Sequence, residues 1–163
     1  MKIYFIGFGS VAHAVIEVWN LENLYKDIPI TIIEPLNIDM WVHKGRKIKH
    51  IKQVIKESNV NKLLREIDSE TLVIDLSVDV DCLMIIKKCS ARDSYYINTS
   101  LENWTNKEEG KPIPKDYNKF KKDTLYYRQE ELDKIKDNMK ANILSNFGQN
   151  PRSYFLICNR GIK

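Results

Sequence analysis

The sequence predicts an α/β fold, a doubly wound and mostly parallel sheet with helices on both faces. Two observations support this prediction. Short apolar segments typical of strands alternate with segments of helical periodicity along the 163 residues, and the first strand runs directly into a glycine-containing turn. Strands joined in this way pair in parallel through right-handed crossovers, and such sheets bind ligands at the carboxyl ends of their strands.

The first half of the chain is predicted to alternate four strands with two helices. We place the strands at residues 2–6, 30–34, 48–51 and 72–76. The first helix is indicated by apolar side chains at helical spacing, namely Val11, Val15, Val18 and Trp19. The second is expected to begin at Ser58 as N-cap and to carry one apolar face, made of Val60, Leu63, Leu64 and Ile67.

The second half continues the alternation. A helix with Cys82, Ile85, Ile86 and Cys89 on one face precedes a strand at 95–98. The polar segment 105–123 is interpreted as a loop or lid, followed by a helix at 128–140 with Leu132, Ile135 and Met139 facing inward. A last strand is expected at 142–147. We assign residues 1–151 to one dinucleotide-binding domain and 152–163 to a short tail, with room for a short helix.

The turn after the first strand reads Gly-x-Gly-x-x-Ala over residues 7–12. Gly7 permits a tight turn, Gly9 removes a Cβ that would block a pyrophosphate, and Ala12 lets the helix lie close to the sheet. The helix N-terminus, with Ser10 and Val11, offers free N–H groups and a partial positive charge to phosphates. These residues are therefore candidate cofactor contacts in a Rossmann-type, dinucleotide-binding domain.

An acid follows the second strand. Glu34 comes 27 residues after Gly7, near the position of the ribose-binding carboxylate of dinucleotide sites. A carboxylate there accepts hydrogen bonds from ribose hydroxyls and repels a 2′-phosphate, so NAD is favoured over NADP. The alternative interpretation is that Glu34 is only the polar end of a strand.

The net charge is +4, but residues 43–56 contain six basic side chains and no acid. Such a run is one feature of nucleic-acid-binding proteins. Alternation with isoleucines and the absence of a base-stacking aromatic stripe favour a strand with a solvated lysine-rich face instead. Nucleic acid is therefore not the expected partner.

Several classes of protein are disfavoured by composition. No apolar run reaches the roughly 18 residues that a membrane span needs, and the N-terminus lacks a signal-peptide layout, so we expect a cytoplasmic protein. The three cysteines and three histidines show no metal-ligand spacing, so no metal site is predicted. Cys82 and Cys89 are interpreted as buried thiols.

Four motifs together resemble one family. They are the glycine turn Gly7–Ser10 and the segments Leu76–Asp79, Tyr96–Trp104 and Phe147–Pro151, whose order and spacing are similar to homospermidine synthase, of the saccharopine dehydrogenase-like group. The resemblance implies a bound NAD that takes a hydride from a carbon of putrescine and returns it after the imine has exchanged its amine partner.

The resemblance also implies site residues. Glu102 matches an acid of the family's Glu-x-Trp segment near the polyamine, and Asn150 matches the asparagine of its Gly-x-Asn-Pro turn, so both are candidate catalytic residues. A carboxylate suits a cationic diamine. Ser77, Val78 and Thr99 follow the central strands and are taken as further cofactor contacts.

Three features depart from the family pattern. Asp75 and Arg152 stand where the family usually has asparagine and glycine, and the family continues into a second, larger domain. We therefore expect a truncated domain that is not fully catalytic alone and that needs a missing domain or partner chain to complete its substrate site. A second copy of this chain in a homo-oligomer is another possible source of the residues that enclose this site. The alternatives are a non-catalytic dinucleotide-binding relic and one subunit of a split saccharopine dehydrogenase-like oxidoreductase.

Overall fold

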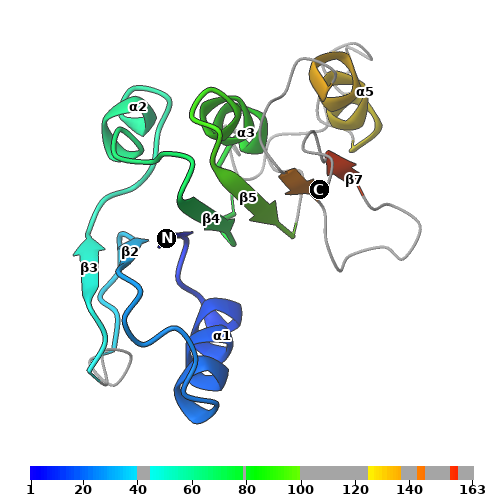
Figure 1. Ribbon diagram of the computed structural model, residues 1–163. Helices are drawn as coiled ribbons and strands as arrows, with labels where there is room; N and C mark the ends of the chain where they lie inside the picture. The colour runs from blue at the N-terminus through cyan, green and yellow to red at the C-terminus, as the bar shows by residue number, and fades with distance from the viewer. Residues whose placement is uncertain (40–44, 79, 100–124, 137–142, 146–154, 158–163) are drawn as a thin grey trace.

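The computed structural model describes residues 1–39, 45–78, 80–99, 125–136, 143–145 and 155–157 (Figure 1). The described residues form a sheet of seven strands in the order β3-β2-β1-β4-β5-β6-β7. The strands are β1 (Lys2–Ile6), β2 (Ile30–Ile33), β3 (Ile48–Ile51), β4 (Thr71–Asp75), β5 (Tyr95–Asn98), β6 (Ile143–Ser145) and β7 (Phe155–Ile157). Strands β1 to β6 pair in parallel, and β7 is antiparallel to β6.

The strand order reverses at the centre of the sheet. The chain moves outward from β1 to β3, returns to β4 on the other side of β1, and then moves outward again. This is the order of the doubly wound dinucleotide-binding folds, which the sequence predicted. The point of reversal lies between β1 and β4, so the crevice for a ligand is expected at the carboxyl ends of these two strands.

Helices cover both faces of the sheet, as predicted. Figure 1 shows α1 (Ser10–Leu21) on one side, with α2 (Val60–Leu63), α3 (Cys82–Ser90) and α5 (Leu125–Lys136) on the other. Strand β1 is buried by both layers, because Ile3 and Phe5 pack with α1 while Tyr4 and Ile6 pack with the opposite layer. The continuous apolar sequence of β1 is the pattern expected of a central parallel strand.

The face of α1 that is buried differs from the face predicted from the spacing of its apolar residues. Ala12 and Ile16 are fully buried, whereas Val11 and Val18 are 58% and 53% exposed. Val15 and Trp19 are only partly buried against the same cluster. The small Ala12 brings the start of the helix against the sheet directly after the glycine turn, and this contact selects the face that carries Ile16.

Two other local predictions need correction. Helix α2 begins after Asn59, not Ser58. The Asn59 side chain accepts a hydrogen bond from the Lys56 N–H at its Oδ1 and donates one from its Nδ2 to the Val54 carbonyl. The helix is also shorter than predicted, because it ends at Leu63, and Leu64 and Ile67 lie beyond it. All four apolar residues are nevertheless buried. Within the short tail, which has room for a short helix, residues 155–157 instead form the strand β7. The segment 105–123 and Met139 lie outside the described residues.

The basic run is also different from a simple solvated face. Lys47, Lys49, Lys52 and Lys56 are exposed. Arg46 is buried, and it donates to Asn20 Oδ1 at 2.6 Å and to the carbonyls of Leu24 and Tyr25 at 2.8 and 2.9 Å. Burial lowers the pKa of Arg46. This guanidinium therefore ties the start of β3 to the end of α1 and belongs to the fold.

No helix in the described part of the chain is long and apolar enough to cross a membrane.

Candidate functional site

A cleft of about 340 Å³ opens at the carboxyl ends of β1, β2 and β4, where the strand order reverses. This volume falls within the roughly 300–1,000 Å³ of small-molecule sites. Four segments line it: residues 6–9 after β1, 33–35 after β2, 53–55 after β3, and 76–78 with Val80 after β4. Glu34 is the one charged residue among these described lining residues.

Glycine occupies positions 7 and 9 of the turn for two different structural reasons. Gly7 has a φ of +77°, and a Cβ at this position would lie 2.8 Å from the Ser77 Cα and 2.9 Å from the Ser77 nitrogen. A side chain here would be strained and would collide with the β4 loop. Gly7 is therefore required by the fold, because the first turn packs directly against the chain after β4.

Gly9 meets no such obstacle. A Cβ built on Gly9 would have no protein atom within 4 Å, and the residue has an ordinary extended conformation as the N-cap of α1. The protein alone does not demand glycine at this position. The bare backbone instead leaves open space at the helix N-terminus, which suits a pyrophosphate approaching the free N–H groups.

Glu34 reaches back to the glycine turn. Its Oε2 accepts a hydrogen bond of 2.8 Å from the Phe8 N–H, and its Oε1 accepts one of 3.0 Å from the Leu36 N–H. The Glu34 carbonyl oxygen lies 2.9 Å from His50 Nε2. The carboxylate is thus fixed in the cleft beside the turn, while each of its oxygens can still accept a further hydrogen bond.

A buried network supports the wall after β4. Asp75 Oδ1 accepts hydrogen bonds from the Ser77 Oγ at 2.6 Å and the Ser77 N–H at 3.1 Å, while Oδ2 accepts one from the Tyr96 hydroxyl at 2.9 Å. Burial and the nearby Asp75 carboxylate raise the pKa of Tyr96 well above its ordinary value. The network holds Ser77, whose backbone abuts Gly7, in a fixed position.

The structure brings together five of the predicted cofactor contacts. Gly7, Gly9, Glu34, Ser77 and Val78 all line the cleft. Ser10 lies beside Gly9 but lines a neighbouring open hollow of about 400 Å³, with His13, Ala14 and Glu17. Val11 and Thr99 line neither hollow. Glu102 and Asn150, the candidate catalytic residues, lie outside the described residues.

Sequence reasoning missed the segment after β3. Gln53, Val54 and Ile55 line the cleft, and Val54 is 51% exposed at its mouth. Val78, on the β4 loop, is also an exposed apolar side chain of the cleft. The signal that could have found Val54 and Ile55 is this apolar pair, three and four residues after the end of a predicted parallel strand, which the basic run obscured.

The buried thiols are confirmed for Cys82 and Cys89, and burial raises the pKa of Cys89. Over the ranges that the structure describes, no three side chains of His, Cys, Asp or Glu gather as a metal site would require.

Comparison with known proteins finds relatives by sequence and by structure. Homospermidine synthase from Mesorhizobium japonicum is 24% identical over 106 residues, covering 63% of this chain and 22% of that protein. The crystal structure of the Legionella pneumophila homospermidine synthase in complex with NAD has a TM-score of 0.70 at 22% identity. That match covers 92% of this chain and 30% of the Legionella chain, so the chain spans under a third of either relative.

A second solved structure is more distant. A short-chain dehydrogenase/reductase from Veillonella parvula in complex with NADP has a TM-score of 0.51 at 15% identity, covering 88% of this chain and 67% of that one. Both structures support the doubly wound fold. The sequence profile of the saccharopine dehydrogenase NADP binding domain matches residues 3–144, which is most of the chain. The chain therefore belongs to the saccharopine dehydrogenase NADP-binding domain family.

Proposed function

We propose that this chain binds NAD in the cleft between the glycine turn and Glu34. The observation that carries the proposal is the pairing of an open backbone at Gly9 with a carboxylate fixed 2.8 Å from the Phe8 nitrogen. The first feature suits the pyrophosphate, and the second suits the adenosine ribose. The apolar side chains of Val54 and Val78 suit the flat faces of an adenine ring.

The charge of the cleft favours NAD over NADP. Glu34 is the sole charged residue of the described lining, and neither lysine nor arginine belongs to it. A ribose 2′-phosphate would face this carboxylate without a basic side chain from the described lining to offset the repulsion. The family takes its name from NADP, whereas the similar Legionella enzyme was solved with NAD.

The reaction of this proposed NAD domain follows from the resemblance to homospermidine synthase. NAD supplies a hydride acceptor and donor when bound, and a polyamine is the proposed substrate, with Glu102 and Asn150 as its predicted contacts. Because the chain spans under a third of its relatives, we assign the remaining walls of the substrate site to a further domain or partner chain. Such walls exclude water and position the substrate.

In two alternatives, this chain binds NAD but does not catalyse the reaction by itself. A relic would bind NAD without any partner, and a subunit of a split enzyme would gain activity when its complementary chain is added. A coding sequence for the missing domain next to the gene would favour the split enzyme. Steep salt-dependent affinity for nucleic acid would instead revive the function suggested by residues 43–56.

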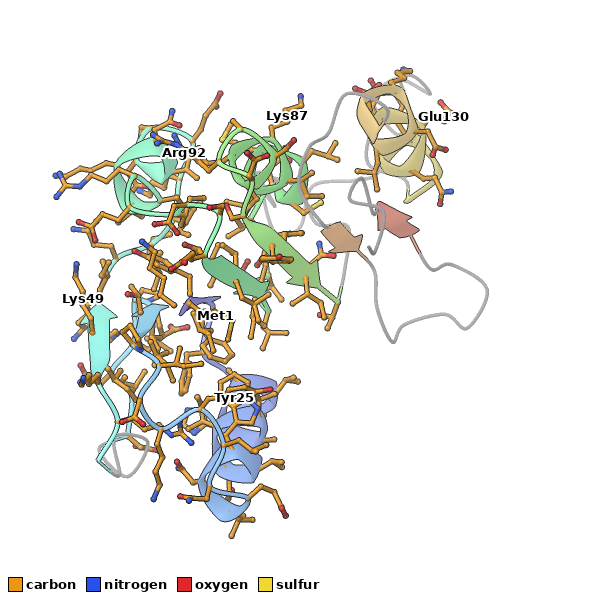
Figure 2. The ribbon with its side chains drawn as sticks, viewed as in Figure 1. Met1, Tyr25, Lys49, Lys87, Arg92 and Glu130 are labelled. Carbon is orange, nitrogen blue, oxygen red and sulfur yellow. The ribbon has the colours of Figure 1, made fainter. Side chains whose placement is uncertain are left out.

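Two lysines labelled in Figure 2 lie on other parts of the described chain. Lys49 lies at the open edge of the sheet on β3, and Lys87 lies on the outer side of the α3 layer. Neither belongs to the cleft lining. Lys49 is also paired with Glu66 at 3.7 Å, which offsets part of the local charge.

Calorimetric titration with NAD and NADP tests the proposal. We expect saturable binding of NAD that is at least about tenfold tighter than binding of NADP, a difference of roughly 1.4 kcal/mol. Absence of binding by both cofactors would refute the proposed function. Tighter binding of NADP would refute the role assigned to Glu34 but not the nucleotide site.

A further inference from the structure

We propose that a hollow between β3 and α2 binds a single phosphate group, at a site separate from the NAD cleft. The hollow has a volume of about 190 Å³. Three cations line it: Lys49 of β3 (Figure 2), Lys62 of α2, and Arg65, which follows α2. Tyr4 of β1 lines it from the sheet. None of these four residues lines the NAD cleft, so the inference does not depend on the proposed cofactor.

The charges around the hollow are predominantly positive. Glu66 is the one acid in its described lining, and its carboxylate lies 3.7 Å from Lys49 Nζ and 3.4 Å from Arg65 Nη2. Lys62 has no ion-pair partner among the described residues. Three positive charges against one negative charge leave a net of two positive charges, which matches the charge of a phosphate dianion.

The Tyr4 hydroxyl is a hydrogen-bonding group that the described part of the chain leaves unused. Tyr4 is only 3% exposed, and no described residue forms a hydrogen bond with its hydroxyl. Among the described side chains, Asn20 Nδ2 is the one fully buried polar atom without a partner, so the Tyr4 hydroxyl retains contact with solvent. Because Tyr4 lines this hollow, its otherwise buried side chain presents the hydroxyl there.

A second buried tyrosine in the same core cluster provides the contrast. The Tyr96 hydroxyl donates to Asp75 Oδ2 at 2.9 Å, as buried tyrosines usually find a partner within the protein. Tyr4 instead stands in the apolar sequence of β1, where phenylalanine would supply the same packing. A hydroxyl at this position, beside three cations, is suited to an acceptor that a ligand supplies.

A phosphate group suits both the size and the donors of the hollow. The volume is below the roughly 300–1,000 Å³ of sites that enclose whole small molecules, so one phosphate group fits it better than a nucleotide does. A phosphate dianion carries three strong acceptor oxygens, and the ammonium, guanidinium and hydroxyl groups here are all donors. A carboxylate carries one negative charge and would leave one of the two positive charges unmatched.

Two substitutions each remove one donor. Tyr4→Phe deletes only the hydroxyl, and because no described residue bonds that group, the melting temperature should not fall. Lys62→Gln removes one exposed cation. Each should raise the dissociation constant of phosphate by about threefold or more, as the loss of one hydrogen bond does. Lys87→Gln, at an exposed position of α3 outside the hollow, is the matched control and should stay within about 1.5-fold of wild type.

The test is a titration of the isotopically labelled chain with inorganic phosphate, followed by amide chemical shifts at about pH 8, where phosphate is mainly a dianion. Sodium chloride holds the ionic strength constant, so that nonspecific screening does not change. We expect saturable shifts at the amides of Lys62, Leu63 and Arg65. A parallel titration with glycerol phosphate separates two sources of the group. Tighter binding than that of free phosphate indicates an esterified ligand, and equal or weaker binding indicates the free ion.

Shifts that stay linear with concentration, or dissociation constants that are equal in wild type, Tyr4→Phe and Lys62→Gln, would overturn the inference. Saturable shifts confined to Gly9 and Ser10 would also overturn it, and they would support a phosphate at the glycine turn of the proposed NAD site instead. If Tyr4→Phe does not fold, the exposed Lys62→Gln and its control Lys87→Gln provide the same test.

Discussion

The Phe8 backbone N–H donates a hydrogen bond of 2.8 Å to the Glu34 carboxylate, across 26 positions of sequence. The contact joins the glycine turn after β1 to the end of β2. It gives Glu34 a structural role in addition to the proposed one, since the carboxylate also orders the turn. The first prediction separates these two roles.

Glu34→Gln should weaken the preference for NAD over NADP by about tenfold or more, since it removes the charge that repels a 2′-phosphate. Glutamine keeps one oxygen to accept from Phe8, so the melting temperature should change little. The measurement is paired titration with the two cofactors. Glu57→Gln, at an exposed position outside the cleft, is the control. An unaltered ratio would show that Glu34 does not approach the ribose.

The two glycines of the turn should respond in opposite ways to alanine. Gly7→Ala should destabilise the fold by about 2 kcal/mol or more, because it combines a positive φ with a Cβ 2.8 Å from the Ser77 Cα. Gly9→Ala should cost only about 1 kcal/mol or less, because its φ is ordinary and alanine is merely a poorer N-cap than glycine. It should nevertheless weaken NAD binding by about tenfold or more, because the methyl group occupies the phosphate's path.

Urea unfolding and calorimetry on the same two proteins check this pair. Equal loss of stability at both positions would contradict the structural distinction between them. Normal NAD affinity in Gly9→Ala would remove the phosphate from the turn.

Arg46 should contribute to stability although it belongs to the basic run. Arg46→Met removes three hydrogen bonds from a buried cation and leaves the Leu24 and Tyr25 carbonyls without this donor. We expect a loss of about 2 kcal/mol in the free energy of unfolding. Lys47→Met, at the exposed neighbouring position, should change it by no more than about 0.5 kcal/mol. Equal effects at both positions would refute the buried role of Arg46.

Asp68 gives the fold an acid-sensitive contact. Hydrogen bonds from Lys2 and Thr71 lower the pKa of Asp68 from 3.8 to about 2. Because the folded-state pKa is depressed, the stabilisation is fully present above pH 3.8 and is lost as the pH falls through about 2. Lys2→Met should therefore reduce stability most above pH 4 and progressively less toward pH 2.

Urea titrations between pH 2 and pH 6 measure that difference, with Lys62→Met as a control on an exposed lysine of α2. A difference between wild type and Lys2→Met that stays constant over this range would contradict the assignment.

The sequence was sufficient to predict those parts of the fold that depend on local patterns. The first strand, the glycine turn and the helix with Cys82 and Cys89 are each determined by a short motif. The inner face of α1 was not predictable from periodicity, since apolar residues occupy both faces and the contact of Ala12 with the sheet decides between them. The burial of Arg46 was equally hidden, because its acceptors come from the end of α1 and the turn after it.

The candidate site shows the same division. Gly7, Gly9 and Glu34 were identified from spacing alone. The contribution of Gln53 and Val54 depends on how far the segment after β3 reaches over the strand ends, which is a property of the sheet rather than of the segment. The hydrogen bond between Asp75 and Tyr96 likewise requires the register of β4 against β5.

The most direct test of the account is to map the NAD site on the isotopically labelled chain by amide chemical shifts. We predict that NAD shifts the amides of Phe8, Gly9, Ser10, Glu34 and Val54, while the amides of Lys49 and Lys62, which do not line the cleft, stay unchanged. Shifts centred on the lysine-rich surface, with the glycine turn unaffected, would contradict the proposal that this cleft holds the cofactor.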